Sequence, residues 1–272
     1  MKHHPLPYVI IFLAGICVVI NLSDYPTSTF TIDTETIKIE SLNQIVPVAD
    51  AFVKPLLYTN VSGLERLPVS EAKTKFISAI LPAILVAKHQ VETVKIKIDV
   101  LREKKNWNEK DSSFYFETKN RYKAKDMNDL ILRIGTLPNS IVLAQAAVES
   151  GWGQSRFFLQ GNNLFGVWSF NANEPRIAAG RARQSKTIYL RAYENMSYSI
   201  IHYFEILGGA SSYRGLRKAR EKKTDPFELL PHLKNFSERR TRYTNQLKAV
   251  ILQNELTEYD HYQIGPRYLV VE

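Results

Sequence analysis

Hydrophobic residues recur at helical spacing along the chain from residue 70 onward. Ser70-Glu71-Ala72-Lys73 resembles a helix start, and it is followed by apolar positions at Phe76, Ile77, Ile80, Leu81, Ile84, Leu85 and Val86. This spacing predicts a long helix, because one face of a helix returns every three to four residues. Pro82 lies inside the run and removes a backbone donor. We therefore expect a kink there, with the helix resuming from Ala83 to Leu101.

The same pattern predicts further helices downstream and a short β region between them. The helical segments are Asp126 to Ile134, Pro138 to Glu149, Ser197 to Leu207, Ser211 to Arg220, Asp225 to Leu233 and Tyr243 to Leu256. Two other segments, Leu164 to Trp168 and Thr187 to Tyr193, have the composition of strands in a hairpin. The predicted fold class is α+β, mostly α. It has a helical lobe and a small β-hairpin lobe, preceded by a helical lead segment.

The N-terminus has the pattern of an export signal. Lys2 precedes an apolar run from Tyr8 to Leu22, which is somewhat shorter than the ~20 residues of a full membrane span. We interpret residues 1–23 as a signal peptide or signal-anchor, and cleavage is left open. Residues 24–69, rich in Ser, Thr and Asp at their start, are interpreted as a stalk or loosely ordered lead. Within them, Thr31 to Glu40 alternates enough to pair as a strand. We therefore expect a periplasmic protein, with inner-membrane association through residues 8–22.

Charge and cysteine content narrow the classes of partner and chemistry. The net charge is +9 and the sequence pI is about 9.4, which suits a polyanion such as nucleic acid, anionic lipid or an acidic cell wall. The basic stretches 214–223 and 239–242 lack a nucleic-acid reader motif, so we expect no nucleic-acid partner. Cys17 is the single cysteine, which excludes an intramolecular disulfide. The scattered histidines have no metal-ligand spacing, so we expect neither a metal nor a cofactor.

Residues 137–170 concentrate the candidate chemistry. Glu149 ends a predicted buried helix and is followed by Gly151-Trp152-Gly153. The C-terminal end of a helix disfavours a carboxylate, and Trp152 and Phe165 would reduce its solvation. Both effects raise the pKa, which suits a general acid near neutral pH. The alternative is an ordinary surface glutamate at a helix end, against which the neighbouring tryptophan argues.

Two motifs in this region carry a family resemblance. SIVLAQAAVESGWGQSRF followed by GNNLFGVW resembles the glucosaminidase-type peptidoglycan hydrolases, family 73 of the glycoside hydrolases. Flanking segments such as YRGLRKAR and FSERRTRYTNQL look most like the bacterial Bax-type members of that group. The resemblance covers roughly residues 70–256. It implies a lysozyme-like fold and hydrolysis of the β-1,4 bond between N-acetylglucosamine and N-acetylmuramic acid.

The resemblance also assigns residues and segments. Glu149 matches the general acid, and Tyr243 matches a tyrosine that faces it. Residues 126–258 are then the catalytic domain, residues 70–125 pack on it, and residues 259–272 are a tail of unknown role. We expect a monomer whose partner is the glycan strand of peptidoglycan. The candidate substrate-binding residues are Gln145, Trp152, Asn163, Phe165, Trp168 and Tyr193.

The β region contains one candidate for a second catalytic carboxylate. Glycosidases normally use two carboxylates that flank the bond. Glu174 is the candidate in the β region, although its NANEP context is typical of a surface turn. Without it, the N-acetyl group of the substrate could act as nucleophile, with Tyr243 or Gln145 polarising it.

Two other functions are left open. A lytic transglycosylase also uses a lone glutamate, but GNNLFG stands where such enzymes have a Gly-Leu-Met-Gln segment. A non-catalytic glycan-binding scaffold is the third possibility, and a missing β-lobe carboxylate would favour it.

Overall fold

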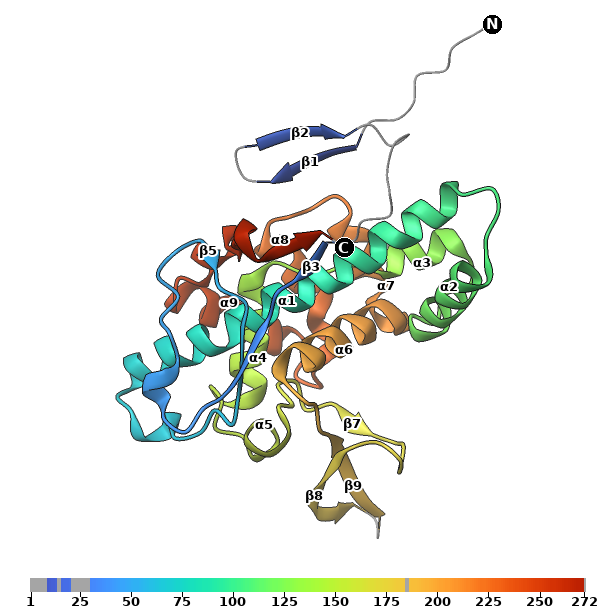
Figure 1. Cartoon of the computed structure of the whole chain (residues 1–272). Helices are drawn as coiled ribbons and strands as arrows, with labels where there is room; N and C mark the ends of the chain where they lie inside the picture. Colours follow the sequence, from blue (N-terminus) through green and yellow to red (C-terminus); the bar gives the residue numbers. More distant parts are fainter. Residues whose placement is uncertain (1–8, 14–15, 21–29, 184–185, 272) are drawn as a thin grey trace, which may run out of the picture.

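The computed structural model describes residues 9–13, 16–20, 30–183 and 186–271, and Figure 1 shows the whole chain. Helices dominate, and the strands form small separate sheets. The predicted α+β, mostly α class is confirmed, with a β-lobe that projects from the helical body (Figure 1). The helices of the predicted lead segment are α1 (Val69–Glu103) and α2 (Glu109–Arg121).

The predicted signal lies partly outside the described residues. Its apolar run forms β1 (Val9–Leu13) and β2 (Ile16–Ile20), which pair antiparallel with Val9 opposite Ile20. Across the described ranges, no helix is both long and apolar enough to cross a membrane. The role of residues 1–23 in export stays a prediction.

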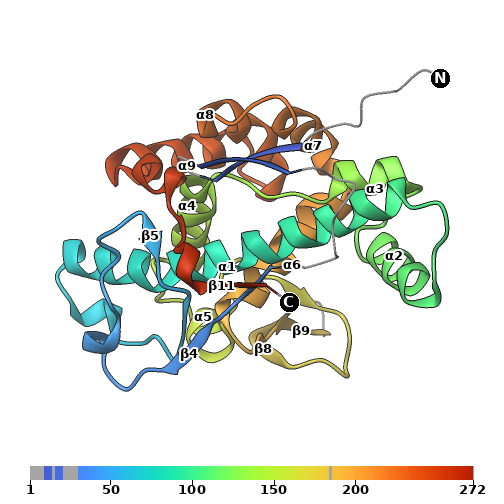
Figure 2. The ribbon, with the colours of Figure 1, turned by 45° about the horizontal axis from the view of Figure 1, so that its top comes forward.

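Helix α1 is the central element of the fold, crossing the middle of the molecule in Figures 1 and 2. It is one continuous helix of 35 residues that includes Pro82. The helix therefore does not stop before Pro82 and resume at Ala83, and the kink at Pro82 stays a prediction. Residues on every side of Pro82, from Ile80 to Leu85, are at most 5% exposed. Packing on all faces holds the helix together where local propensity alone would interrupt it.

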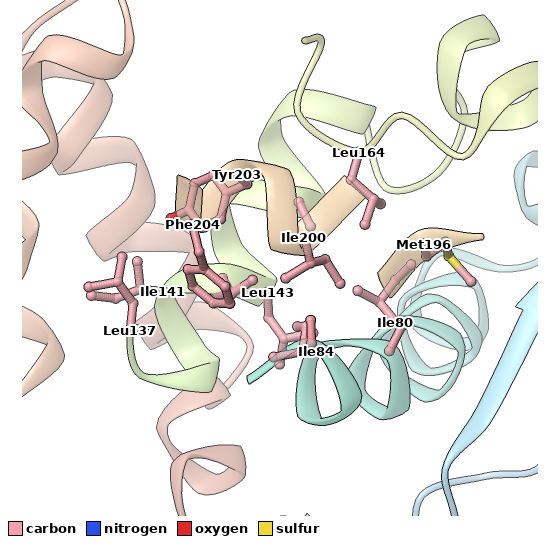
Figure 3. Close-up of a cluster of buried hydrophobic side chains, with 14 of the residues drawn as sticks. Ile80, Ile84, Leu137, Ile141, Leu143, Leu164, Met196, Ile200, Tyr203 and Phe204 are labelled. Carbon is pink, nitrogen blue, oxygen red and sulfur yellow. The ribbon is translucent and has the colours of Figure 1, made fainter. Parts of the chain in front are cut away.

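The remaining helices surround α1 and largely match the predicted segments. They are α3 (Met127–Arg133), α4 (Asn139–Ser150), α5 (Arg156–Gly161), α6 (Met196–Gly209), α7 (Arg214–Arg220), α8 (Pro226–Leu229) and α9 (Thr241–Gln253). The core lies where α1, α4 and α6 meet. Figure 3 shows part of this core, with Ile80 and Ile84 from α1, Ile141 and Leu143 from α4, and Ile200 and Phe204 from α6.

Residues 30–69 are not a stalk. They form β3 (Phe30–Ile32), β4 (Glu35–Lys38), β5 (Phe52–Val53) and β6 (Leu56–Thr59). Strand β4 pairs parallel with β6, and the buried side chains of Ile39, Ile45, Tyr58 and Leu64 join the main core. The predicted strand at Thr31 to Glu40 corresponds to β3 and β4. Strands of two to four residues are too short for their sequence pattern to reveal that the segment packs on the main core.

The predicted tail, residues 259–272, is also part of the fold. It forms β10 (Gln263–Ile264), which pairs with β5, and β11 (Leu269–Val271), which pairs with β3. The 3₁₀ helix η6 (Leu256–His261) packs against α4. There Asp260 accepts hydrogen bonds from the backbone and hydroxyl of Ser140, at 2.7 and 2.8 Å. This contact caps the N-terminus of α4, which Pro138 does not cap by its own side chain.

The β-lobe is larger than the predicted hairpin. Strands β7 (Trp168–Ser169), β8 (Arg176–Arg183) and β9 (Lys186–Arg191) form an antiparallel sheet in the order β7-β9-β8. The predicted strand at Leu164 to Trp168 is mostly loop, and β8 was missed because its arginines and small residues give no alternating pattern. The pairing of β8 with β9 shifts register between Ala178 and Ala182, where Gly180 has φ +70°.

Candidate active site

The end of α4 places Glu149 at a sharp turn of the chain. Small alanines at positions 144, 146 and 147 bury this helix closely among its neighbours. Gly151 ends it in the left-handed conformation with φ 60°, and its N–H bonds Ala147 O. Trp152 and Gly153 follow with φ 56° and φ 80°. A Cβ on Gly153 would lie 2.9 Å from Leu64 Cδ1, so glycine allows close approach of the turn to residues 30–69.

Trp152 secures this turn to α1. Its ring meets Phe76 edge-on with centroids 5.4 Å apart, and Lys73 Nζ lies 4.9 Å from the indole centroid. A contact between Trp152 and the substrate stays a prediction. Its half-buried ring fixes the segment that follows Glu149 against the helical core.

Glu149 is a half-buried carboxylic acid. Desolvation raises its pKa above the ordinary value for glutamate, while a hydrogen bond from Tyr243 and the charge of Arg239 act in the opposite direction. The direction agrees with the shift that the sequence predicts. The net effect favours the protonated form of the carboxyl group at a pH where exposed carboxylates have lost their proton.

Tyr243 is held beside Glu149 by helix α9. Its residue is 0% exposed, and α9 packs on α4 with Leu247 and Ile251 buried. The Tyr243 hydroxyl accepts a hydrogen bond from Gln145 Nε2 at 2.9 Å and interacts with the carboxylate of Glu149. The structure therefore brings together the tyrosine and glutamate that the sequence analysis paired.

Three of the predicted substrate-binding residues are buried. Gln145 is 0% exposed, and its two polar ends contact tyrosines, so it is not available to a glycan. Asn163 is 1% exposed, and its amide holds a turn by donating to Val167 O and Arg191 O. Phe165 is 5% exposed and stacks on Tyr203 with ring centroids 4.3 Å apart. These residues shape the site from inside.

Trp168 is exposed, in contrast to those three. It is 48% exposed on β7, and the ring of Phe170, which is 88% exposed, lies 6.2 Å away. The two rings form an apolar surface on the β-lobe. Phe170 escaped the sequence analysis because it follows the predicted strand and carries no motif.

Tyr193 and Glu174 make their contacts with Arg191 and His202 and not with Glu149. Glu174 forms an ion pair with Arg191 at 3.1 Å, and the Tyr193 hydroxyl lies 2.8 Å from His202 Nδ1. Tyr193, Arg191 and His202 line a cavity of about 460 Å³ formed with residues of α1, α2 and α6. Tyr203 of α6, by contrast, reaches Gln145 in the core. The groups that shift the pKa of Glu149 are Tyr243 and Arg239, and neither is a carboxylate.

Arg239 and Tyr203 are the site residues that sequence reasoning missed. Arg239 is exposed, lies with its guanidinium 5.5 Å from the Tyr243 ring centroid, and acts on Glu149 through its charge. It belongs to a run of basic residues in which nothing distinguishes one arginine from the next.

In the described part of the chain, no three His, Cys, Asp or Glu side chains are placed to hold a metal ion.

Comparisons with known proteins found a family match and a curated relative. Residues 124–256 match the model of the glucosaminidase family, described as mannosyl-glycoprotein endo-beta-N-acetylglucosaminidase. The curated relative Protein bax of Escherichia coli (strain K12) is 27% identical over 137 residues, which are 47% of this chain and 47% of that protein. The match thus spans about half the length of that relative.

Solved structures of an autolysin and of a glycoside hydrolase domain were also found. The catalytic domain of the autolysin Auto from Listeria monocytogenes has 21% identity and a TM-score of 0.39, covering 61% of this chain and 96% of that chain. The glycoside hydrolase domain of FlgJ from Salmonella typhimurium has 24% identity and a TM-score of 0.35, covering 45% and 77%. The family match includes Glu149, Tyr243 and the β-lobe, and it covers 133 of the 272 residues of this chain.

Proposed function

We propose that this protein is a peptidoglycan hydrolase, an endo-β-N-acetylglucosaminidase that cleaves the β-1,4 bond between N-acetylglucosamine and N-acetylmuramic acid. The observation that carries the proposal is Glu149. It is a half-buried carboxyl group whose pKa is raised by desolvation, and it lies within the segment that matches the glucosaminidase family. A protonated carboxyl beside the glycosidic oxygen is the general acid that glycoside hydrolysis requires.

The surroundings of Glu149 support a reaction with one enzyme carboxylate. Glu174 is held by Arg191, and Tyr243 is buried between Gln145 and Glu149, so neither is offered to the substrate. In the proposed reaction Glu149 gives its proton to the glycosidic oxygen as the bond from that oxygen to C1 breaks. The acetamido oxygen of the same sugar forms a bond to C1. Water then replaces that oxygen at C1 and returns a proton to Glu149.

The role of Glu149 is tested with purified sacculi and the variants Glu149→Gln and Glu174→Gln. We expect Glu149→Gln to release no muropeptides, because an amide cannot donate the proton, while Glu174→Gln keeps most of the activity. Activity in Glu149→Gln equal to the wild type would sink the assignment. Loss of activity in both variants, with both folded, would instead support a two-carboxylate mechanism.

Product analysis separates the remaining alternatives. Retention of the β-anomer at the new reducing end is expected if the acetamido oxygen is the nucleophile, whereas inversion indicates direct attack by water. Anhydro-muramic ends would identify a lytic transglycosylase. Binding to sacculi without any released fragment would identify a glycan-binding scaffold.

Location and membrane association belong to the same proposal. Peptidoglycan lies outside the cytoplasm, and residues 8–22 have the composition of an export signal. We therefore expect the protein in the periplasm, with the inner membrane fraction retaining it if the segment is not cleaved. Fractionation of cells that express the full chain or a chain lacking residues 1–23 tests this. Equal export of both forms would contradict it.

A further inference from the structure

A line of polar side chains crosses the otherwise apolar core and ends at Glu149. The Tyr203 hydroxyl donates to Gln145 Oε1 at 2.5 Å, and Gln145 Nε2 donates to the Tyr243 hydroxyl at 2.9 Å. Tyr243 in turn interacts with the carboxylate of Glu149. These residues come from α6, α4 and α9, and Tyr203, Gln145 and Tyr243 are each at most 1% exposed. Buried polar groups of this kind are costly unless every member is paired.

The donor and the acceptor of each hydrogen bond along this line follow from the number of hydrogens that each group carries. A phenol carries one hydrogen, and an amide offers an acceptor at its oxygen and donors at its nitrogen. Tyr203 uses its hydrogen on the oxygen of Gln145, so the nitrogen of Gln145 faces Tyr243. The Tyr243 oxygen accepts from that nitrogen, and its own hydrogen is left for Glu149.

We propose that Gln145 and Tyr203 are positioning residues that fix the hydroxyl of Tyr243 as a hydrogen-bond donor to Glu149. The inference rests on the proposed function of Glu149 as general acid. A carboxylate at position 145 would accept from both tyrosines and draw the hydrogen of Tyr243 away from Glu149. An apolar residue would leave that hydrogen free to turn. An amide is the side chain that accepts at one end and donates at the other.

Aromatic packing holds the two phenols in place. Phe165 stacks on Tyr203, and the ring of Phe236 lies parallel to Tyr243 within 8°, with centroids 5.8 Å apart. Figure 3 shows Tyr203 among the packed apolar side chains of the core. Both tyrosines are at most 1% exposed, so the surrounding packing restricts movement of their hydroxyl groups away from Gln145. The function of buried Phe165 is then to hold Tyr203 in this line.

Two opposing effects on the pKa of Glu149 follow for catalysis. Burial favours the protonated carboxyl, while the Tyr243 donor favours the carboxylate that forms once the proton has left. The titratable groups that face Glu149 from neighbouring elements are Arg239, Tyr203, Tyr213 and Tyr243. Among them Tyr243 supplies the hydrogen bond, and its orientation depends on Gln145 and Tyr203. A donor fixed in advance stabilises developing charge without reorganising during the reaction.

The experiment follows the Glu149 carboxyl directly by carbon-13 NMR across pH, with its resonance assigned from Glu149→Gln. The variants are Tyr203→Phe, which removes one hydroxyl and keeps the ring, and Gln145→Met, which removes both bonds at similar volume. The matched control is Tyr58→Phe. Tyr58 is also 0% exposed, and its hydroxyl accepts from Val46 N at 3.0 Å, away from Glu149.

We expect both variants to raise the pKa of Glu149 by about half a unit or more, because the carboxylate loses an ordered donor. The alkaline limb of the pH profile for kcat/KM should move to higher pH by the same amount. Tyr58→Phe should leave the titration unchanged. A titration unchanged in Tyr203→Phe, with a loss of stability like that of Tyr58→Phe, would overturn the proposal. If Gln145→Met fails to fold, Tyr203→Phe decides alone.

The titration also separates this inference from the function on which it rests. If the wild-type protein releases nothing from sacculi, the proposed hydrolase function is wrong. The NMR shift would still report whether Gln145 and Tyr203 orient Tyr243. Conversely, the wild type could be active while the variants leave the pKa of Glu149 unchanged. That result would support the hydrolase and contradict the positioning role of Gln145 and Tyr203.

Discussion

The phenol of Tyr243 and the carboxyl of Glu149 interact directly, although they come from different helices and Tyr243 is itself anchored by a bond to Gln145, 98 residues away in sequence. Burial raises the pKa of Glu149, and this contact opposes the rise. The chemistry at α4 therefore depends on a residue that the sequence motif around Glu149 does not contain. Direct consequences can be measured at Tyr243 and at its neighbour Arg239.

Tyr243→Phe should move the alkaline limb of the pH profile for kcat/KM to higher pH. The substitution removes the donor that lowers the pKa of Glu149, so Glu149 should keep its proton to higher pH. It also leaves the buried Gln145 nitrogen without its acceptor, which should lower the free energy of unfolding by about 1–3 kcal/mol. Rates on soluble glycan fragments and urea denaturation measure the two effects. A limb that moves to lower pH would contradict the assignment.

Arg239→Gln should make the pH profile insensitive to salt. The Arg239 side chain is exposed, and its charge lowers the pKa of Glu149 through solvent. Added salt screens such an interaction, with a Debye length of about 10 Å at 0.1 M and about 3 Å at 1 M. In the wild type the alkaline limb should shift to higher pH as salt increases. In the variant, the alkaline limb should already lie at the higher pH in low salt, and it should not move as salt increases. A salt response equal in both proteins would exclude this role.

Trp168→Ala and Phe170→Ala should weaken binding of glycan more than they slow its cleavage. Both rings are exposed on the β-lobe and close to each other, which is the arrangement that stacks on sugar rings. Loss of one aromatic contact should raise KM by about two- to tenfold, with a smaller change in kcat. Phe116→Ala is the matched control, because Phe116 is 55% exposed on α2. An equal effect of all three substitutions would refute a specific stacking surface.

Gly153→Ala should destabilise the protein more than Gly151→Ala. Both glycines have positive φ, so alanine is strained at either position. At Gly153 a Cβ would also lie 2.9 Å from Leu64 Cδ1, whereas at Gly151 it would meet no described atom within 4 Å. We expect a loss of about 2–4 kcal/mol for Gly153→Ala and about 1–2 kcal/mol for Gly151→Ala. Urea denaturation measures the difference, and equal losses would show that close packing at Gly153 does not matter.

His202→Gln should make the protein less sensitive to acid. Burial and the charge of Arg191 lower the pKa of His202 to about 4 in the folded state. Because the ordinary value is near 6.5, the unfolded chain takes up a proton first as the pH falls. The stability that neutral His202 contributes is complete above about pH 6.5 and is lost between there and about pH 4, by on the order of 2 kcal/mol.

Denaturation at pH 7 and pH 4 tests this loss. The Gln side chain keeps an acceptor for Arg191 and Tyr193 but does not titrate. His261→Gln serves as control, because His261 is exposed in η6. An acid response as steep in His202→Gln as in the wild type would show that other groups cause it.

Several features of the site could be predicted from sequence because their causes are local. The apolar spacing and small residues of residues 138–149 gave the buried helix α4, and Gly151 gave its left-handed end. The carboxylate at that end, with apolar neighbours, gave the direction of the pKa shift at Glu149. Each inference used residues within a few positions of one another.

Other features were wrong or missing in the sequence analysis. Residues 30–69 were assigned to a stalk, yet Tyr58 and Leu64 lie in the core. Gln145 was assigned to the substrate, but it is sealed between two tyrosines. Tyr193 was grouped with Glu149, but it contacts His202 at a separate cavity. In each case the deciding contact joins different elements, and the periodicity of one segment holds no information about which partner its buried face meets.

The sequence by itself therefore determined that a mostly helical chain with a small β-lobe carries a general-acid candidate at the end of a buried helix. The family resemblance of its motifs implied Tyr243 as the partner of Glu149. Tertiary structure alone decided that Gln145 bonds the hydroxyl of that tyrosine and that Tyr203 bonds Gln145. It also decided that Glu174 is paired with Arg191. The physical reason is that hydrogen-bond direction and ion pairing depend on distances of about 3 Å between side chains. The packing of α4, α6 and α9 around one core sets those distances.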